Sequence, residues 1–180
     1  EAEIIYEELA ASEDQSFEVL LDIAMTYMDA NQKEYAAKWI KKIQEKGYNE
    51  TNSQKFRDLW CDFSMTFGEA SKATKAFQLS LDEQPYSIPH WNGMAKCYLA
   101  QMQIEQAHEA VDFALAIDEN NLEALEVKGF CYLQNENYEE ALAIYQQLLP
   151  QSQAPSRIYA FITKCYLDLE RAQEAKDTCL

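Results

Sequence analysis

Small and apolar positions return along this chain at an interval of about 34 residues. The clearest of them is a column of alanines, which is evenly spaced apart from one slightly longer step between its second and third members: Ala2, Ala36, Ala73, Ala107, Ala141 and Ala175. We call this spacing the repeat interval. One compact core requires no such interval, whereas copies of a single supersecondary unit stacked end to end produce it. The pattern therefore predicts a repeat array.

Other columns keep the same step. Small residues stand twelve positions before each alanine from Ala36 onward: Ala24, Cys61, Ala95, Gly129 and Thr163. Three positions further on, the chain has Tyr27, Ser64, Tyr98, Tyr132 and Tyr166. Spacings of three and four residues place side chains on one helix face, and a small residue lets two helices cross closely. Each copy is therefore predicted to be a hairpin of two helices. The first, helix A, carries the small residue and the tyrosine, and the second, helix B, carries the alanine.

Polar turn residues and capping signals divide the copies. Short polar stretches at 31–32, 68–69, 101–103 and 135–137 predict the turn inside each hairpin, while Gly47 and Pro85 are typical of the breaks between hairpins. The predicted repeats are 17–50, 54–87, 88–121, 122–155 and a partial copy at 156–180, with residues 1–16 supplying helix B of a preceding repeat. The insertion 51–53 accounts for the one longer step in the alanine column.

With these columns the chain resembles the tetratricopeptide repeat family, whose hairpins of about 34 residues carry a bulky residue, a small residue, Tyr, Ala, an aromatic residue and a terminal Pro. The third copy shows the match with Trp91, Ala95, Tyr98, Ala107 and Val111. Ser64 in the tyrosine column and Lys128 in an apolar column depart from it. The resemblance spans essentially the whole chain and implies an all-α, right-handed superhelical array (an α-solenoid) of antiparallel hairpins, about five units long.

The repeat pattern is incomplete at both ends. Residues 1–11 supply only helix B columns, and the chain stops at Leu180 within helix B of the last copy. Arrays need polar caps over their terminal apolar faces. We therefore expect the chain to be a slice of a longer protein, truncated at both ends, whose uncapped termini could pair two copies end to end as a homodimer.

Candidate chemistry is sparse. Cys97, Cys131 and Cys165 are each one repeat interval apart, so they occupy one position in three copies, beyond the roughly 7 Å that a disulfide spans. We expect buried, reduced thiols, with metal or redox chemistry as the alternative, and such thiols favour a cytoplasmic location. His90 and His108 have no evident catalytic partners. The sequence predicts no cofactor, no metal and no enzymatic activity in this chain.

Charge narrows the range of partners. The chain has 15 basic and 31 acidic residues, a net charge of −16, which disfavours nucleic acid because binding to phosphates requires cations. No stretch approaches the roughly 18 apolar residues of a membrane span. One basic cluster is expected to form a solvated outer helix face, with a docking patch as the alternative: Lys33, Lys38, Lys41, Lys42, Lys46, Lys55 and Arg57.

The family resemblance implies that stacked A helices line a concave groove for a peptide or a partner helix. On the family's pattern the inward positions, four residues apart in each copy, are Leu21, Met25, Asp58, Asp62, Asn92, Lys96, Glu126, Phe130, Ala160 and Lys164. Asp58 and Asp62 would favour a segment with some basic character. Val127 and Phe161 stand where family members that grip chaperone C-terminal carboxylates have polar residues, so we expect no such clamp.

The predicted function is therefore a protein–protein interaction scaffold that holds a partner segment in this groove. The alternative is a structural or self-association element of a larger multidomain protein, without a peptide ligand of its own. Nothing in the residues identifies the partner.

Overall fold

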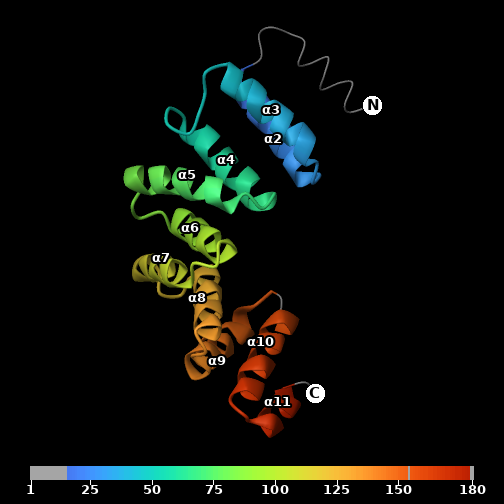
Figure 1. Cartoon of the computed structure of the whole chain (residues 1–180), viewed down its shortest axis with the longest axis vertical. Coiled ribbons are helices and arrows are strands. Elements are labelled where there is room, and N and C mark those ends of the chain that lie inside the picture. The colour runs from blue at the N-terminus through green and yellow to red at the C-terminus, as the bar shows by residue number, and fades with distance from the viewer. Residues whose placement is uncertain (1–15, 154, 179–180) are drawn as a thin grey trace. The chain divides into compact units, whose positions relative to one another are not determined.

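The computed structural model describes residues 16–153 and 155–178, which form ten α-helices and one short 3-10 helix and contain no strand (Figure 1). The helices are α2 Phe17–Asp29, α3 Lys33–Glu45, α4 Gln54–Thr66, α5 Ala70–Glu83, α6 Ile88–Ala100, α7 Ile104–Ile117, α8 Leu122–Gln134, α9 Tyr138–Leu148, η1 Leu149–Gln151, α10 Pro155–Asp168 and α11 Ala172–Thr178. The predicted all-α fold of successive helix hairpins is confirmed. The helix expected before residue 16, with Ala2, lies outside the described residues.

The chain divides into two compact units, residues 1–80 and 81–180. In unit 1, α2 packs against α3 and also against α4. In unit 2, each helix from α6 to α11 packs against the next one along the chain, and α6 also packs against α8. A helix A thus contacts both its own helix B and the A helix of the following hairpin.

The alanine and small-residue columns lie where the helices cross. Ala36, Ala73, Ala107 and Ala141 have no exposed surface, and Ala175 is nearly as buried. Four of the five small residues of helix A are buried as well: Ala24, Cys61, Ala95 and Gly129. At Gly129 a Cβ atom would lie 3.0 Å from Cζ of the Tyr145 ring, so only glycine fits this crossing without a shift of the ring. The predicted role of these columns is confirmed.

Every hairpin turn has one residue in the left-handed backbone region. These residues are Asn31, Gly68, Met102, Glu136 and Glu170, with φ between 55° and 75°. The residue that follows each of them donates its N–H to the carbonyl of the tyrosine column five positions earlier, as in Glu69 to Ser64 at 2.7 Å. This bond satisfies a carbonyl at the end of helix A and reverses the chain into helix B.

Side-chain caps fix where several A helices begin. The side-chain oxygens of Ser16, Ser53 and Asn121 each accept a hydrogen bond from the backbone N–H three residues later, at the starts of α2, α4 and α8. Such a cap satisfies one of the orphan N–H groups of the first turn. These three A helices, which carry predicted groove positions, are therefore anchored at their first residue.

One member of the basic cluster is not on an outer face. Arg57 is 2% exposed; its Nε donates to Ser80 Oγ at 3.2 Å and its Nη1 to the carbonyl of Glu50 at 2.9 Å. The prediction that Arg57 is solvated is wrong, because the long guanidinium side chain reaches acceptors in α5 and in the loop before α4. The cluster's Lys33 and Lys55 are exposed and form ion pairs with Glu69 and Glu18.

Candidate functional site

A cavity of about 800 Å³ lies along the A helices of three successive hairpins in unit 2, α6, α8 and α10. We call it the α8 groove, after its central helix. Its lining residues are Lys96, Leu99, Ala100, Leu122, Glu123, Glu126, Val127, Phe130, Leu148, Gln151, Ser152, Gln153, Arg157, Ile158 and Phe161. The predicted groove residues Lys96, Glu126 and Phe130 are among them.

The helical period explains why these side chains converge. Four lining residues of α8 lie on one stripe of the helix, because they are spaced three or four residues apart: Glu123, Glu126, Val127 and Phe130. The same period brings Arg157, Ile158 and Phe161 of α10 to the groove. The lining thus comes from helices, apart from Ser152 and Gln153 between η1 and α10.

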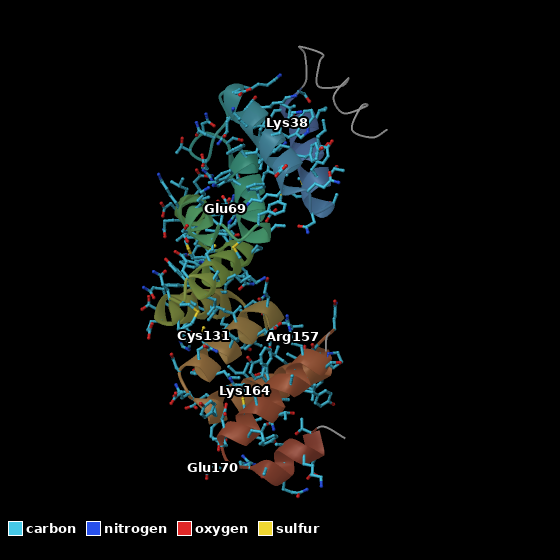
Figure 2. The ribbon with its side chains drawn as sticks, turned by 45° about the vertical axis from the view of Figure 1, so that its right-hand side comes forward. Lys38, Glu69, Cys131, Arg157, Lys164 and Glu170 are labelled. Carbon is cyan, nitrogen blue, oxygen red and sulfur yellow. The ribbon has the colours of Figure 1, made fainter. Side chains whose placement is uncertain are left out.

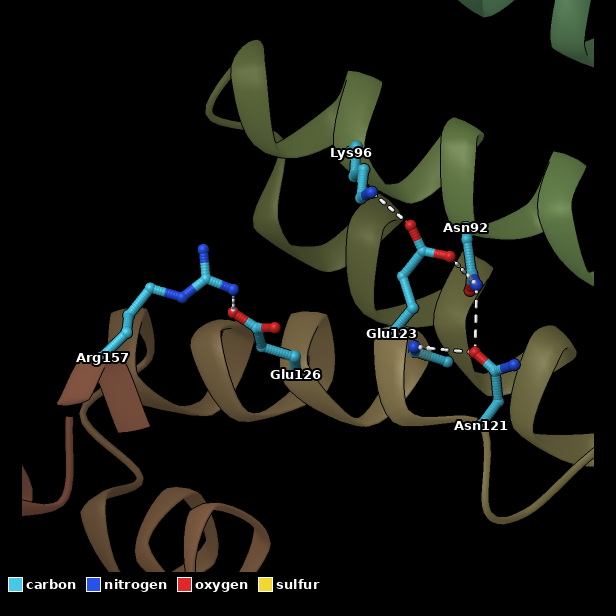
Figure 3. Close-up of polar contacts among 7 residues, drawn as sticks. Asn92, Lys96, Asn121, Glu123, Glu126 and Arg157 are labelled. Carbon is cyan, nitrogen blue, oxygen red and sulfur yellow. Dashed lines mark hydrogen bonds and ion pairs between the residues drawn. The ribbon is translucent and has the colours of Figure 1, made fainter. Parts of the chain in front are cut away.

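A polar network joins α6 to α8 at one end of the groove (Figure 3). Asn92 Nδ2 donates to Asn121 Oδ1 at 3.0 Å and to Glu123 Oε2 at 2.8 Å, and Lys96 Nζ forms an ion pair with Glu123 Oε1. Asn121 Oδ1 also accepts the N–H of Ala124, so the helix cap is part of the same network. Asn92 is only 2% exposed. The structure therefore places this predicted groove residue beneath the surface, where it connects the two helices.

Burial raises the pKa of Glu123, but the hydrogen bonds from Lys96 and Asn92 and the charge of Lys96 together outweigh it. The pKa of this carboxyl therefore lies below its usual value, and Glu123 stays ionised against Lys96.

A second ion pair joins α8 to α10, between Glu126 and Arg157 (Figure 3). Arg157 lies one repeat interval after Glu123, and Glu126 lies one repeat interval after Asn92. The contact between α8 and α10 therefore uses the same repeat positions as the contact between α6 and α8. Lys96, Glu123, Glu126 and Arg157 are the charged residues among those that line the groove. Their formal charges sum to zero, 2 − 2 = 0, in a chain whose net charge is −16.

Aromatic rings form part of the groove and extend beneath it. Phe130 and Phe161 meet edge to face with ring centroids 6.4 Å apart, and Phe161 stacks on Tyr145 of α9 at 4.8 Å. Tyr145 is fully buried, and its hydroxyl has no hydrogen-bond partner among the residues that the structure describes. Burial raises the pKa of Tyr145 far above its usual value. The stacked rings give the groove a rigid apolar wall.

A smaller cavity of about 330 Å³ lies between α2 and α4 in unit 1, and we call it the α2–α4 cavity. Its lining residues are Met25, Met28, Asp29, Asp62, Met65 and Thr66. The predicted residues Met25 and Asp62 are among them, whereas Leu21 is buried and Asp58 is half-buried away from this lining.

The predicted position Lys164 faces a third cavity, about 1180 Å³ in volume, which is lined mainly by α10 and α11. Ala160 lines the same cavity. Figure 2 labels both Arg157 and Lys164 on α10, yet only Arg157 lines the α8 groove. Seven of the ten predicted positions are thus divided among three cavities, while Leu21, Asp58 and Asn92 line none of these. The structure brings Lys96, Glu126 and Phe130 together.

Several groove residues were not among the predicted positions, notably Leu122, Glu123, Arg157 and Phe161. Each lies within a turn of a predicted position on the same stripe of helix A. A prediction that took the whole stripe, instead of two positions per copy, would have included them.

Four cysteines of the A helices are buried: Cys61, Cys97, Cys131 and Cys165. Burial raises the pKa of Cys131 and of Cys165 to about 11. The burial predicted from their spacing is confirmed. Among residues 16–153 and 155–178, no group of three or more His, Cys, Asp or Glu side chains is arranged to hold a metal ion.

His108 is part of a structural contact: its Nδ1 lies 3.4 Å from Asp112 Oδ2, and its ring meets the edge of Tyr132. Of the helices in the described part of the chain, none combines the length and the apolar character needed to cross a bilayer.

These features define a class of protein, an array of helix hairpins with a groove along its A helices. The model of the tetratricopeptide repeat family matches residues 103–165. The general transcriptional corepressor trfA of Dictyostelium discoideum is 26% identical over 118 residues, which are 63% of this chain but only 8% of that protein. The chain thus corresponds to a small part of this relative.

Solved structures extend the likeness in fold. The crystal structure of MamA protein has a TM-score of 0.72 at 16% identity, covering 90% of this chain and 87% of that one. A tetratricopeptide repeat protein from Parabacteroides merdae has a TM-score of 0.75 at 14% identity, covering 93% of this chain and 64% of that one. Residues 103–165 thus match the tetratricopeptide repeat model in sequence, and about nine tenths of the chain share the fold of these solved structures.

Proposed function

We propose that this chain is a protein–protein interaction scaffold that binds a segment of a partner protein in the α8 groove. The observation that carries the proposal is the cavity of about 800 Å³ along α6, α8 and α10, with eight apolar residues among the fifteen that line it. Concave, largely apolar sites with a few oriented polar groups are the usual form of a binding site.

The polar groups of the groove support binding over catalysis. Glu123 and Glu126 are each held in an ion pair by a cation from the neighbouring helix. A general acid or base needs to exchange its proton with a substrate, and a carboxylate fixed in an ion pair is poorly suited to that. We therefore propose a non-catalytic role, and the buried cysteines of the A helices favour a reducing, cytoplasmic setting for it.

The repeat division remains part of this proposal. The units are residues 17–50, 54–87, 88–121, 122–155 and 156–180, and the A helices α4, α6 and α8 begin at Gln54, Ile88 and Leu122, each one repeat interval after the last. Within unit 2, the equal spacing of α6 and α8 gives the groove two A helices in the same register.

A displayed library of random dodecapeptides tests the proposal. Peptides selected on the whole chain would be added to it in hydrogen-exchange measurements. The expected result is slower exchange in α6, α8 and α10, with little change in α7 and α11. A library that yields no binder, or protection confined to α11 or to unit 1, would contradict binding in the α8 groove.

A further inference from the structure

The charged side chains that line the α8 groove already form ion pairs with one another. Lys96 pairs with Glu123, and Arg157 pairs with Glu126, so each charge contributed by α8 is neutralised by a flanking helix (Figure 3). A charged side chain that entered the groove would have to compete with one of these intramolecular partners. The pairs are also pre-formed, so they offer no unbalanced charge to attract a ligand.

The apolar part of the lining is continuous. Val127 and Phe130 of α8 lie along the groove with Ile158 and Phe161 of α10, and Phe161 is held by its stack on Tyr145. Leu122, at the first turn of α8, is 38% exposed and lines the same cavity. Aliphatic and aromatic walls of this kind gain free energy from burying a bulky apolar side chain.

Neutral polar groups stand beside these walls. Gln151, the last residue of η1, and Gln153, between η1 and α10, line the groove and are exposed. A side-chain amide carries both donors and an acceptor, so it can pair with the backbone of an incoming segment without adding charge.

From this balance of charge and lining, and on the basis of the proposed function, we infer that the α8 groove selects its partner segment by a bulky, uncharged anchor side chain such as Leu, Phe or Trp. The anchor lies against Phe130 and Phe161, and the four charged residues at the groove keep their own partners. Binding is therefore driven by burial of apolar surface and depends little on salt. This differs from the basic segment that Asp58 and Asp62 suggest in the sequence.

Peptides from the displayed library test the inference directly. Selected sequences are expected to be enriched in Leu, Phe or Trp, with no preference for net charge. For a synthetic, fluorescently labelled peptide of this kind, fluorescence anisotropy should show less than about a twofold change in Kd between roughly 50 and 500 mM NaCl. Replacing the anchor residue by Ala should weaken binding about tenfold or more.

A pair of matched variants localises the anchor. Leu122→Asp should weaken binding about tenfold, because it places a charge beside the apolar wall at a helix N-terminus that tolerates an acidic residue. Leu167→Asp changes a residue of α10 that is 57% exposed and lies outside the groove, and it should leave Kd within about twofold. Leu122→Ser provides a milder second variant, and thermal melting checks that each variant is folded.

The outcomes separate the inference from the proposed function. A charged consensus, or a steep loss of affinity with salt, for peptides that protect α6, α8 and α10 would overturn the inference and leave the proposed function in place. Protection elsewhere, or no binder at all, would overturn both. Self-association detected by sedimentation and abolished by Leu122→Asp would show that a second copy occupies the groove, which also overturns the inference.

Discussion

The α2–α4 cavity and the α8 groove are both lined by A helices, yet their side chains differ in kind. The first is lined by three methionines, two aspartates and a threonine, and the second by aromatic and aliphatic residues with two ion pairs. In unit 1 the described ion pair between A helices, Lys55 with Glu18 at 3.3 Å, lies outside the cavity, and both of its side chains are largely exposed.

The comparison shows that the repeat determines where the helices meet, whereas the side chains at those positions vary from copy to copy. Lys55, Glu123 and Arg157 are separated by whole numbers of repeat intervals, and each forms an ion pair with the preceding A helix. The backbone therefore decides where helices meet and where a hollow forms. The residues at those positions decide whether the hollow is flexible and acidic, as with Met and Asp, or rigid and neutral.

The largest expected effect concerns the buried charge of unit 1. Arg57→Ala should lower the free energy of unfolding by about 3 kcal/mol, because it removes a buried hydrogen bond to Ser80 and a partly buried one to the Glu50 carbonyl. Chemical denaturation followed by circular dichroism measures this. The matched control is Lys55→Ala, two residues away and exposed, which should change stability by less than about 0.5 kcal/mol. Equal effects of the two variants would contradict the buried role of Arg57.

The rigidity of the two linings can be compared directly. Phe161→Ala should cost about 2 kcal/mol, since it removes the stack on Tyr145 and the edge contact with Phe130. Met25→Ala changes a side chain that is 49% exposed in the α2–α4 cavity and should cost less than about 0.5 kcal/mol. Thermal melts of both variants test the contrast, and it fails if Met25→Ala is the more damaging change.

A stabilising change is expected beneath the α8 groove. Tyr145→Phe removes a buried hydroxyl for which the described part of the chain offers no hydrogen-bond partner, and it keeps the ring that stacks on Phe161. Unfolding should therefore become about 1 kcal/mol less favourable, because an unsatisfied buried polar group is lost at nearly constant shape. Urea denaturation at constant pH measures the gain, and a loss of stability would show that the hydroxyl has a partner.

The smallest effect is the pH dependence from Glu123. Its pKa is lowered in the folded state, so its stabilisation is present above the ordinary Glu pKa and is lost as the pH falls through the lower folded-state value. Because the side chain is about half exposed, solvent screening limits this to a few tenths of a kcal/mol. Acid titrations of the wild type and of Glu123→Gln should differ by that amount, with the variant less sensitive to acid.

The periodic parts of the fold were open to prediction from the sequence. The alanine column, the small residues of helix A and the burial of Cys97, Cys131 and Cys165 all follow from the repeat interval, because each copy repeats the same helix crossing. The turns were located as well. The residues with left-handed backbone in these turns were less evident, because only Gly68 among the five is a glycine. The other four adopt a positive φ because of their position in the turn and not because of their residue type.

The groove chemistry was harder to predict because it depends on long side chains that reach across to a neighbouring hairpin. Asn92 and Glu126 occupy the same register, but one is buried in a network with Asn121 and the other forms an ion pair with Arg157. Arg57 is buried for a similar reason, since its acceptors come from the loop before α4 and from α5. A position within one helix does not reveal which partner the next hairpin supplies.

The four buried thiols lie in the A helices α4, α6, α8 and α10, one in each. Cys131 and Cys165 have no exposed surface, so alkylating reagents reach them through local opening. Burial also raises their pKa to about 11, which keeps both thiols protonated at neutral pH. A short pulse of such a reagent, followed by mass spectrometry of the peptides, would therefore measure how fast each cysteine is labelled. The order of these rates reports the order in which the four A helices open.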